Sequence, residues 1–384
     1  MGPLAGLKVV EFATVGPVPM CAMLLADAGA SVIRIERPDP VELGTKRPLK
    51  CDVLRRGRAS LVLDLKAPAD RETARQLIAS SDALIEGYRP GIMEKMGLGP
   101  DECLALNPKL VYGRMTGWGQ NGPLAAAAAH DLNYVAITGA LAAIGQRGQP
   151  PAIPLNLLGD FGGGALYLVF GVMSALFEAA RSGRGQVVDA AIVDGVLSLM
   201  SMQFGALAAG QWKLERGANV IDSGAPFYNV YRCADDRWVS VAPIELRFFR
   251  QLLARMDIDE KALGDRLDRE NWPRIESLLK ERFVQRTQAQ WCELLEGTDS
   301  CFAPVLDMAQ AQRHPQLVAR GAFIEVDGVV QPAPAPRFSR TPCTRPAGPE
   351  PALDADGAAR ALRDWLGPER FEDLLAAQAA RLPS

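Results

Sequence analysis

The sequence is poor in histidine, with only His130 and His314 among its 384 residues. Imidazole exchanges a proton readily near neutral pH, so proton chemistry by a histidine must use one of these two. His314 precedes Pro315, a context that we expect at the surface. His130 is therefore the candidate for proton transfer.

The chain also lacks an excess of charge of either sign. It has 42 basic and 45 acidic residues, a formal net charge of −3 and a pI near 5.7. A polyanion requires a broad basic face, so we expect no nucleic-acid partner.

Cysteine pairs at metal or redox spacing are absent from the sequence. The seven cysteines are scattered and form no C-x-x-C pair, which favours free thiols in a reducing compartment. Lys8 and Glu11 fall inside what would be the apolar core of a signal peptide. The expected location is the cytoplasm.

One long uncharged run is present, residues 161–177, and it approaches the ~20 residues that cross a bilayer. Asp160 and Glu178 bound it, it contains several glycines, and no comparable partner segment exists. We therefore expect a buried central helix and no membrane association. Asp160 would be the N-cap of that helix, and capping alone is the competing explanation for this carboxylate.

The start of the chain predicts a parallel sheet. Residues 7–12 alternate like a strand, 19–29 have helical spacing, and 30–36 form a second strand. The dinucleotide fingerprint is missing after the first strand, where Gly16 and Pro17 are followed by Pro19. We expect no NAD site, and we interpret the G-x-G-x-x-G at residues 117–122 as a chance match.

The remaining segments predict a Rossmann-like α/β large domain with a parallel sheet and a smaller α/β domain. Further strands are expected at 60–65, 82–86 and 110–114, and a hairpin at 227–242 opens the second core. The predicted divisions are a large domain over 1–210, a linker over 211–225, a small domain over 226–330, and a Pro-rich strap with C-terminal helices over 331–384.

A basic cluster stands out in this acidic chain. Guanidinium groups bind phosphates through bidentate, charge-assisted bonds. A phosphate site and a solvated loop both remain open for this cluster, whose members are Arg37, Lys46, Arg47, Lys50, Arg55, Arg56 and Arg58.

Six segments form a recognisable combination, at residues 9–12, 87–91, 114–120, 130–134, 159–164 and 185–190. Together they resemble the family III CoA-transferase superfamily, the CaiB/BaiF-like proteins, and within it the racemases of 2-methylacyl-CoA thioesters. The resemblance extends from residue 4 to about 325 and weakens in the Pro-rich tail.

The resemblance implies roles for individual residues. His130 and Asp160 would be the catalytic acid and base on opposite faces of the substrate α-carbon, and Glu245 would orient the histidine. It implies CoA contacts at Arg37, Leu63, Asp64, Leu65, Lys66, Gly87, Tyr88, Arg89, Lys95, Ala129, Asp131, Leu132, Asn133 and Tyr134. It also implies an interlocked homodimer, no metal, and no cofactor, since CoA is part of the substrate.

Two positions depart from the family pattern. Ala129 stands where these racemases have glycine, which could narrow the space for the thioester. Lys95 stands where an arginine contacts CoA, so the charge is kept but the bidentate fork is lost.

Inverting a carbon next to a thioester requires two bases in opposite protonation states. We expect the enolate oxygen to be bound by N–H groups at the glycine-rich start of the helix after Asp160. The same helix end should lower the pKa of Asp160, so burial beside Glu245 or the apolar acyl chain would have to raise it.

Two alternatives to the racemase remain. In a CoA transferase, Asp160 would attack the thioester as a nucleophile. Transferases of this superfamily carry a glycine-rich loop where residues 241–246 have no glycine. The second alternative is a catalytically silent CoA-binding protein.

Overall fold

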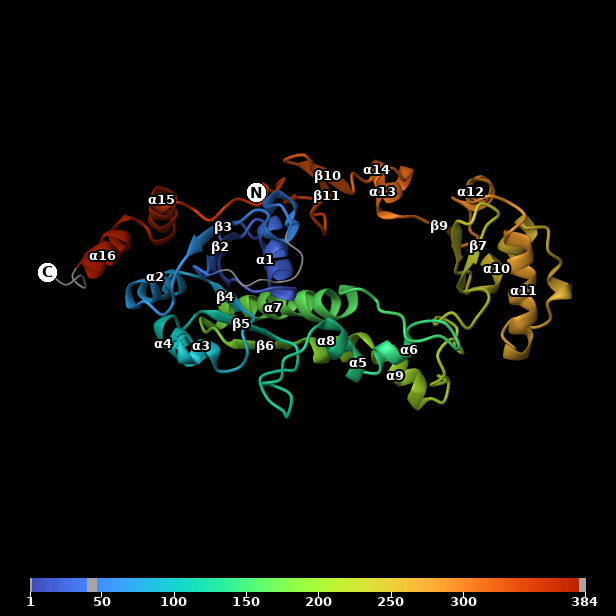
Figure 1. The fold of residues 1–384 in the computed structure, drawn as a ribbon, viewed down its shortest axis with the longest axis horizontal. Helices are drawn as coiled ribbons and strands as arrows, with labels where there is room; N and C mark the ends of the chain where they lie inside the picture. Colours follow the sequence, from blue (N-terminus) through green and yellow to red (C-terminus); the bar gives the residue numbers. More distant parts are fainter. Residues whose placement is uncertain (1, 40–46, 380–384) are drawn as a thin grey trace. The chain divides into compact units, whose positions relative to one another are not determined.

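The computed structural model describes residues 2–39 and 47–379 (Figure 1). The chain divides into two compact units. The large unit comprises Met1–Thr138, Leu155–Leu199 and Gly321–Ser384, and the small unit comprises Gly139–Pro154 and Met200–Arg320. These boundaries differ from the predicted domains, because residues 139–154 belong to the small unit and the segment from Gly321 onward belongs to the large one.

A six-stranded parallel sheet forms the centre of the large unit. Its strand order is β3-β2-β1-β4-β5-β6, the order of a dinucleotide-binding fold. β1, β2, β4 and β5 are largely buried, as expected for a sheet covered on both faces, and the edge strands β3 and β6 are partly exposed. They are β1 (Lys8–Phe12), β2 (Ser31–Glu36), β3 (Ala59–Val62), β4 (Ala83–Glu86), β5 (Val111–Thr116) and β6 (Val187–Ala191). The predicted α/β class is confirmed.

Helices cover both faces of this sheet (Figure 1). α1 (Pro17–Asp27) and α7 (Leu166–Ser182) pack against each other and against the strands on one face. The hydrophobic core of the other face joins strand residues such as Phe12 and Tyr112 to Leu77 and Trp365. The helices there are α2 (Pro68–Ala79), α3 (Ile92–Lys95), α4 (Pro100–Leu106), α15 (Ala355–Leu366) and α16 (Pro368–Ala379).

The glycine-rich segment forms a π-helix, η3 (Leu157–Ala165), that continues directly into α7. The N-cap is Asn156, so the prediction that Asp160 caps this helix was wrong. Gly163 allows close packing on α8 (Ile192–Leu199), because a Cβ there would lie 2.9 Å from the backbone nitrogen of Val196. α5 (Asp131–Ile137) packs against both η3 and α8.

The predicted burial of α7 is only partly correct. Leu168 and Val172 are buried, but Leu166, Phe170 and Phe177 are 51%, 71% and 69% exposed. Leu157–Ser182 is, by length and composition, the one helix among the described residues apolar enough to cross a bilayer. Its buried side packs on β5, as in the core helix of an α/β protein.

A buried ion-pair cluster lies under α1 in the large unit. Glu11 on β1 is fully buried and pairs with Arg34 on β2 and with Arg58, whose Nε lies 2.8 Å from Oε2 of Glu11. Arg56 pairs with Asp27 at the end of α1, and its Nη1 donates to Oε1 of Gln331. Single-turn helices η1 (Leu49–Cys51) and η2 (Val53–Arg55) precede these arginines.

Residues after the small unit return to the large unit. The antiparallel hairpin of β10 (Phe323–Val326) and β11 (Val329–Pro332) is joined to it by the Arg56 hydrogen bonds to Gln331 and Pro332. This hairpin was predicted to belong to the small domain. The predicted C-terminal helix is interrupted at Gly367, which has a φ of +81° and separates α15 from α16.

The small unit has its own antiparallel sheet of β7 (Asn229–Arg232), β8 (Trp238–Val241) and β9 (Phe302–Val305). Its core gathers Tyr231, Phe283 and Trp291, whose rings pack against one another. The helices are α6 (Ala140–Ala143), α9 (Ser201–Ala208), α10 (Leu246–Arg255), α11 (Trp272–Phe283), α12 (Gln288–Leu295), α13 (Met308–Ala311) and α14 (Pro315–Ala319), with single turns η4 (Glu260–Ala262) and η5 (Arg269–Asn271).

Candidate active site

His130 is the N-cap residue of α5, and its side chain is exposed. Its backbone N–H donates to Oδ1 of Asn133 at 3.1 Å, and its carbonyl accepts the N–H of Asn133 at 2.8 Å. These two bonds close a small ring around the first turn of the helix, as in a capping box. The imidazole is therefore carried on a fixed backbone at the start of α5.

Asp160 lies in η3 with its carboxyl group against the loop between β1 and α1. A Cβ built on Gly16 in that loop would stand 3.0 Å from Oδ2 of Asp160. The loop follows the carboxyl end of β1, next to β4 in the sheet, where the strand order reverses. Ligands of open parallel sheets bind in the crevice at such a switch point, so Asp160 stands where this fold binds its ligand.

Electrostatics connect His130 with Asp160. The pKa of Asp160 is raised to about 6, first by burial and then by the negative charge of Asp131, while a hydrogen bond from Asn156 and the charge of His130 lower it. A carboxyl group with such a pKa can donate or accept a proton near neutral pH. A hydrogen bond from the Asp160 N–H to Oδ1 of Asp131 also holds Asp160 at the start of α5, which His130 caps.

Tyr134 joins the loop before His130 to the site. Its hydroxyl donates to the carbonyl of Ala129, and its ring meets that of Trp118 edge-on with centroids 4.7 Å apart. Gly117 makes room for this ring, because a Cβ there would lie 2.0 Å from it. Arg89 is close enough for its charge to lower the pKa of Tyr134, which burial raises.

Several predicted CoA contacts follow the carboxyl ends of neighbouring strands. Arg37 follows β2, and its guanidinium lies 5.9 Å from the ring centroid of Tyr88, which follows β4. Asp64 and Lys66 follow β3 in a turn where the Lys66 N–H donates to Oδ1 of Asp64. Parallel strands end at the same edge, so these residues border one crevice.

Other predicted contacts differ in what they can offer a ligand. Leu63 and Leu65 pack into the core under α2, and the backbone N–H of Leu63 donates to the carbonyl of Glu36 at 2.9 Å. Lys95 ends α3 with an exposed side chain, and Gly87 lies where a Cβ would stand 2.9 Å from Val18. Leu132 is exposed on α5.

The basic cluster is mostly structural. Arg55 pairs with Glu36, while the side chains of Arg56 and Arg58 are buried in ion pairs with Asp27 and Glu11. Interpreting these three arginines as phosphate ligands was therefore wrong. Arg37, Arg47 and Lys50 are exposed, and Lys46 lies outside the described residues.

The predicted binding of the enolate oxygen by η3 does not agree with the hydrogen bonds. The N–H of Asp160 donates to Oδ1 of Asp131 at 2.6 Å, the N–H of Gly159 bonds the same side chain, and the N–H of Phe161 donates to the carbonyl of Asn156. The N–H groups of Gly159, Asp160 and Phe161 are therefore engaged within the protein.

Glu245, the predicted partner of His130, belongs to the small unit. It is the exposed N-cap residue of α10, and its charge acts on Arg266 and Cys301 of the same unit. The proposed contact with His130 stays a prediction. In the part of the chain that the structure describes, no three His, Cys, Asp or Glu side chains gather where they could hold a metal ion.

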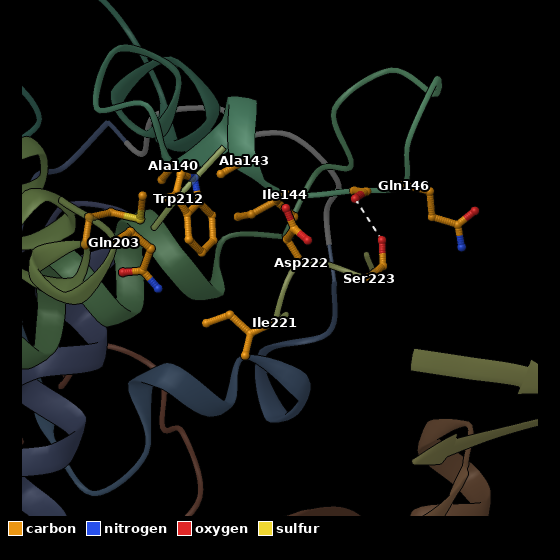
Figure 2. A pocket seen from close by; sticks show the side chains of 11 residues that line it. Ala140, Ala143, Ile144, Gln146, Gln203, Trp212, Ile221, Asp222 and Ser223 are labelled. Atoms are coloured by element: carbon orange, nitrogen blue, oxygen red, sulfur yellow. Dashed lines mark hydrogen bonds between the residues drawn. The ribbon is translucent and has the colours of Figure 1, made fainter. Parts of the chain in front are cut away.

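A separate cavity of about 300 Å³ lies in the small unit. Figure 2 shows the side chains of Gln203, Trp212 and Ile221 around it. Ser223 closes one side by donating to the carbonyl of Gly145 at 3.3 Å. None of the predicted site residues lines this cavity, so its position gives no support to the proton chemistry of His130 and Asp160.

Sequence patterns missed two residues that shape the site. The sequence showed Gly16 only as a break after the first strand. Its φ of +70° and its contact with Asp160 can be seen only in the folded chain. Glu86 accepts the N–H of Tyr88 at 2.7 Å and the Nε of Arg114 at 3.1 Å. An acidic residue at the end of an apolar strand was the available signal for Glu86.

The fold is that of an α/β protein with an open parallel sheet, and Asp160, a carboxyl group able to exchange a proton near neutral pH, lies at the switch point where such proteins bind their ligands. The chain belongs to CoA-transferase family III, because the sequence model of that family matches residues 4–357. The family predicted from the sequence motifs is thereby confirmed.

Curated relatives within this family include two racemases. The α-methylacyl-CoA racemase of Mus musculus is 42% identical over 352 residues, covering 91% of this chain and 90% of the relative. The α-methylacyl-CoA racemase of Homo sapiens is 40% identical, covering 88% of this chain and 87% of the relative. Similarity of this extent places the chain with racemases of the family.

A more distant relative and a solved structure complete the comparison. The acetyl-CoA:oxalate CoA-transferase of Acetobacter aceti is 30% identical, covering 96% of this chain and 97% of the relative. A CaiB/BaiF family protein from Brucella suis has a TM-score of 0.80 at 29% identity, covering 95% of this chain and 99% of that one. The fold is therefore that of the CaiB/BaiF proteins.

Proposed function

We propose that this chain is a racemase that interconverts the (R) and (S) forms of 2-methylacyl-CoA thioesters. The observation that carries this function is that Asp160, whose pKa is raised to about 6, is held by Asp131 at the start of the helix that His130 caps. The two mammalian racemases, similar over about nine tenths of the chain, support the same activity.

The reaction is a proton transfer at C2. One of the two groups removes the α-proton, which leaves a planar enolate, and the other returns a proton to the opposite face. His130 and Asp160 then have exchanged protonation states, and reaction of the opposite enantiomer restores them. The raised pKa of Asp160, about 6, lets its carboxyl group hold or lose a proton near neutral pH.

The enolate oxygen needs hydrogen-bond donors other than those of η3. The N–H groups of Asp131 and Leu132 are the first two of α5, and the first N–H groups of a helix have no acceptor within it. They point along the helix axis toward the N-terminus, where His130 lies. We assign the stabilisation of the enolate to them.

Substrate binding is proposed at the carboxyl edge of the sheet. Arg37 and the exposed side chains of Arg89 and Lys95 supply positive charge there, which suits the phosphates of CoA. The turn at Asp64 and Lys66 is proposed to contact the nucleotide through its backbone. CoA enters as part of the substrate, and the chemistry uses no resident cofactor.

The test is deuterium uptake in heavy water. Each enantiomer of a 2-methylacyl-CoA, incubated without an acceptor acid, should gain deuterium at C2 and lose optical purity. A CoA transferase would instead consume the thioester only when a free carboxylic acid is supplied, and hydroxylamine would trap an aspartyl adduct at Asp160. That second outcome would replace the proposed racemase with the transferase.

A homodimer is part of this proposal. Leu166, Phe170 and Phe177 lie on one face of α7 and are at least half exposed, which is unusual for large apolar side chains of one helix. A second copy of the chain covering this face fits the interlocked dimer that the family resemblance implies. We also propose a cytoplasmic location, on the basis of seven free cysteines.

A further inference from the structure

The carboxylate of Asp131 connects the two proposed proton carriers. Asp131 follows His130 directly in the chain, and its Oδ1 accepts the backbone N–H of Asp160 at 2.6 Å. The backbone N–H of Gly159 bonds the same side chain. One carboxylate thus satisfies two donors in the first turn of η3 while it stands in the first turn of α5.

Close packing between α5 and η3 allows the hydrogen bonds of Asp131 to form. A Cβ at Gly159 would lie 2.3 Å from Oδ1 of Asp131 and 2.9 Å from Cγ2 of Val135, so only glycine at position 159 lets α5 approach so closely. Gly159 and Val135 are buried. The contact therefore belongs to the interior between η3 and α5.

Charged and polar groups act on the Asp160 carboxyl from α5 and from its own segment. Asp131 and His130 act on it by charge from the start of α5, the pKa of Tyr134 on the same helix responds to its charge, and Asn156 donates a hydrogen bond to it. The loop before α1 approaches the carboxyl with Gly16, and α8 meets η3 through Val196 near Gly163, neither of which carries charge. Among these groups, Asp131 is the carboxylate whose negative charge raises the pKa of Asp160.

We propose that Asp131 is a positioning residue for Asp160. Its carboxylate ties the backbone of Asp160 to the first turn of α5, directly after His130, and its negative charge favours the protonated form of the Asp160 carboxyl group. This role rests on the proposed racemase function and differs from the CoA contact that the family resemblance implies for Asp131. The negative charge of Asp131 also raises the pKa of Asp160, and so it opposes the start of η3, which would lower that pKa.

The pH profile of kcat/KM provides a test with a defined sign. The active state of the pair holds one proton, so the acid limb marks the loss of the first of the pair's two protons and depends on the pKa of Asp160. Asp131→Asn removes the negative charge beside Asp160 and lowers the pKa of Asp160. The acid limb should therefore move to lower pH.

The shift is measured by deuterium wash-in at C2 across the pH range. With the Asp160 pKa at about 6, the wild-type enzyme should keep about a tenth of its maximal activity at about pH 5. Asp131→Asn should keep a severalfold larger fraction there. Its KM for the thioester should stay within about twofold of the wild-type value, because the substitution is isosteric.

Asp131→Ala is the second variant. It removes the charge and the acceptor, so the acid limb should move in the same direction, and kcat should fall roughly tenfold further because the backbone at Asp160 loses its anchor. Asp189→Asn is the matched control, since the Asp189 carboxylate accepts one backbone N–H, from Gln120 at 3.3 Å. Its acid limb should remain that of the wild type.

Other outcomes overturn the assignment. An unmoved acid limb in both Asp131 variants, with a lowered melting temperature, would make Asp131 a purely structural residue. A raised KM with an unmoved limb would return Asp131 to a substrate contact. Absence of wash-in by the wild-type enzyme would instead overturn the proposed function, on which the assignment rests.

Discussion

The carboxyl group of Asp160 lies against the backbone of Gly16, where a Cβ atom would stand 3.0 Å from Oδ2. The φ of Gly16 is +70°, in the region that favours glycine. The contact joins the loop after the first strand to a residue that lies far along the chain in η3. The position of the proposed acid therefore depends on a turn that has no reacting side chain of its own.

Gly16→Ala should lower kcat by about tenfold to a hundredfold, because the added methyl group displaces the Asp160 carboxyl. Gly6→Ala is the control, since Gly6 has a φ of +93° with nothing within 4 Å of an added Cβ. Both variants should lose about 1 kcal/mol of stability from the unfavourable φ. Equal kcat values in the two variants would contradict the contact with Asp160.

Tyr134→Phe should reduce kcat several-fold with a smaller change in KM. The substitution removes the hydroxyl that donates to the carbonyl of Ala129 and so loosens the residue before His130. Tyr167→Phe also removes a tyrosine hydroxyl, one that donates to Ser198 at 2.7 Å. Steady-state kinetics of both variants should separate the loop effect from the general loss of a hydroxyl group.

Arg37→Ala should raise KM more than it lowers kcat, and the effect should shrink as salt is added, because phosphate binding is electrostatic. Arg58→Ala should instead lower the melting temperature, since its side chain is buried against Glu11. If Arg37→Ala leaves KM unchanged at low and high salt, Arg37 is a solvated surface residue.

Glu11→Gln should reduce the free energy of unfolding by about 3 kcal/mol, because it leaves the buried charges of Arg34 and Arg58 without their partner. Glu372→Gln breaks an exposed pair with Arg363 and should change stability by less than about 1 kcal/mol. Urea denaturation of both variants measures the difference. A small effect of Glu11→Gln would mean that water enters the cluster.

Co-expression of His130→Ala with Glu245→Ala tests whether two copies of the chain share a site. If Glu245 orients His130 of the other copy, the heterodimer contains one intact site and one doubly damaged site, and its activity should exceed that of either mutant alone. Isolated heterodimers without such recovery, from mutants that are folded and dimeric, would show that Glu245 acts within its own chain or away from His130.

Local patterns were sufficient for most of the large unit. The strand at 7–12 and the βαβ order appear close to their predicted positions, because buried parallel strands are uniform apolar runs between turn residues. Periodicity could not predict the exposed face of α7. Phe170 and Phe177 are apolar in sequence, and only the three-dimensional packing shows that the neighbours of α7 leave them uncovered.

The site was predicted less completely than the fold. The scarcity of histidine and the family motifs pointed to His130 and Asp160, and the structure links them through the hydrogen bond from the Asp160 N–H to Asp131, the residue after His130. The clustering of basic residues did not predict phosphate binding by Arg56 and Arg58. A sequence does not show that these two arginines form ion pairs with Asp27 and Glu11, which come from other elements of the fold. The bond from Asp160 to Asp131 likewise depends on the approach of two helices.

The division of the chain has a consequence for its synthesis. The large unit includes residues on both sides of the small unit, and its core contains Trp365, Leu366 and Leu374. These three residues are synthesised after the whole of the small unit. Because domains fold as units when their residues emerge, the small unit can fold during translation, whereas the core of the large unit cannot be completed until Leu374 has left the ribosome.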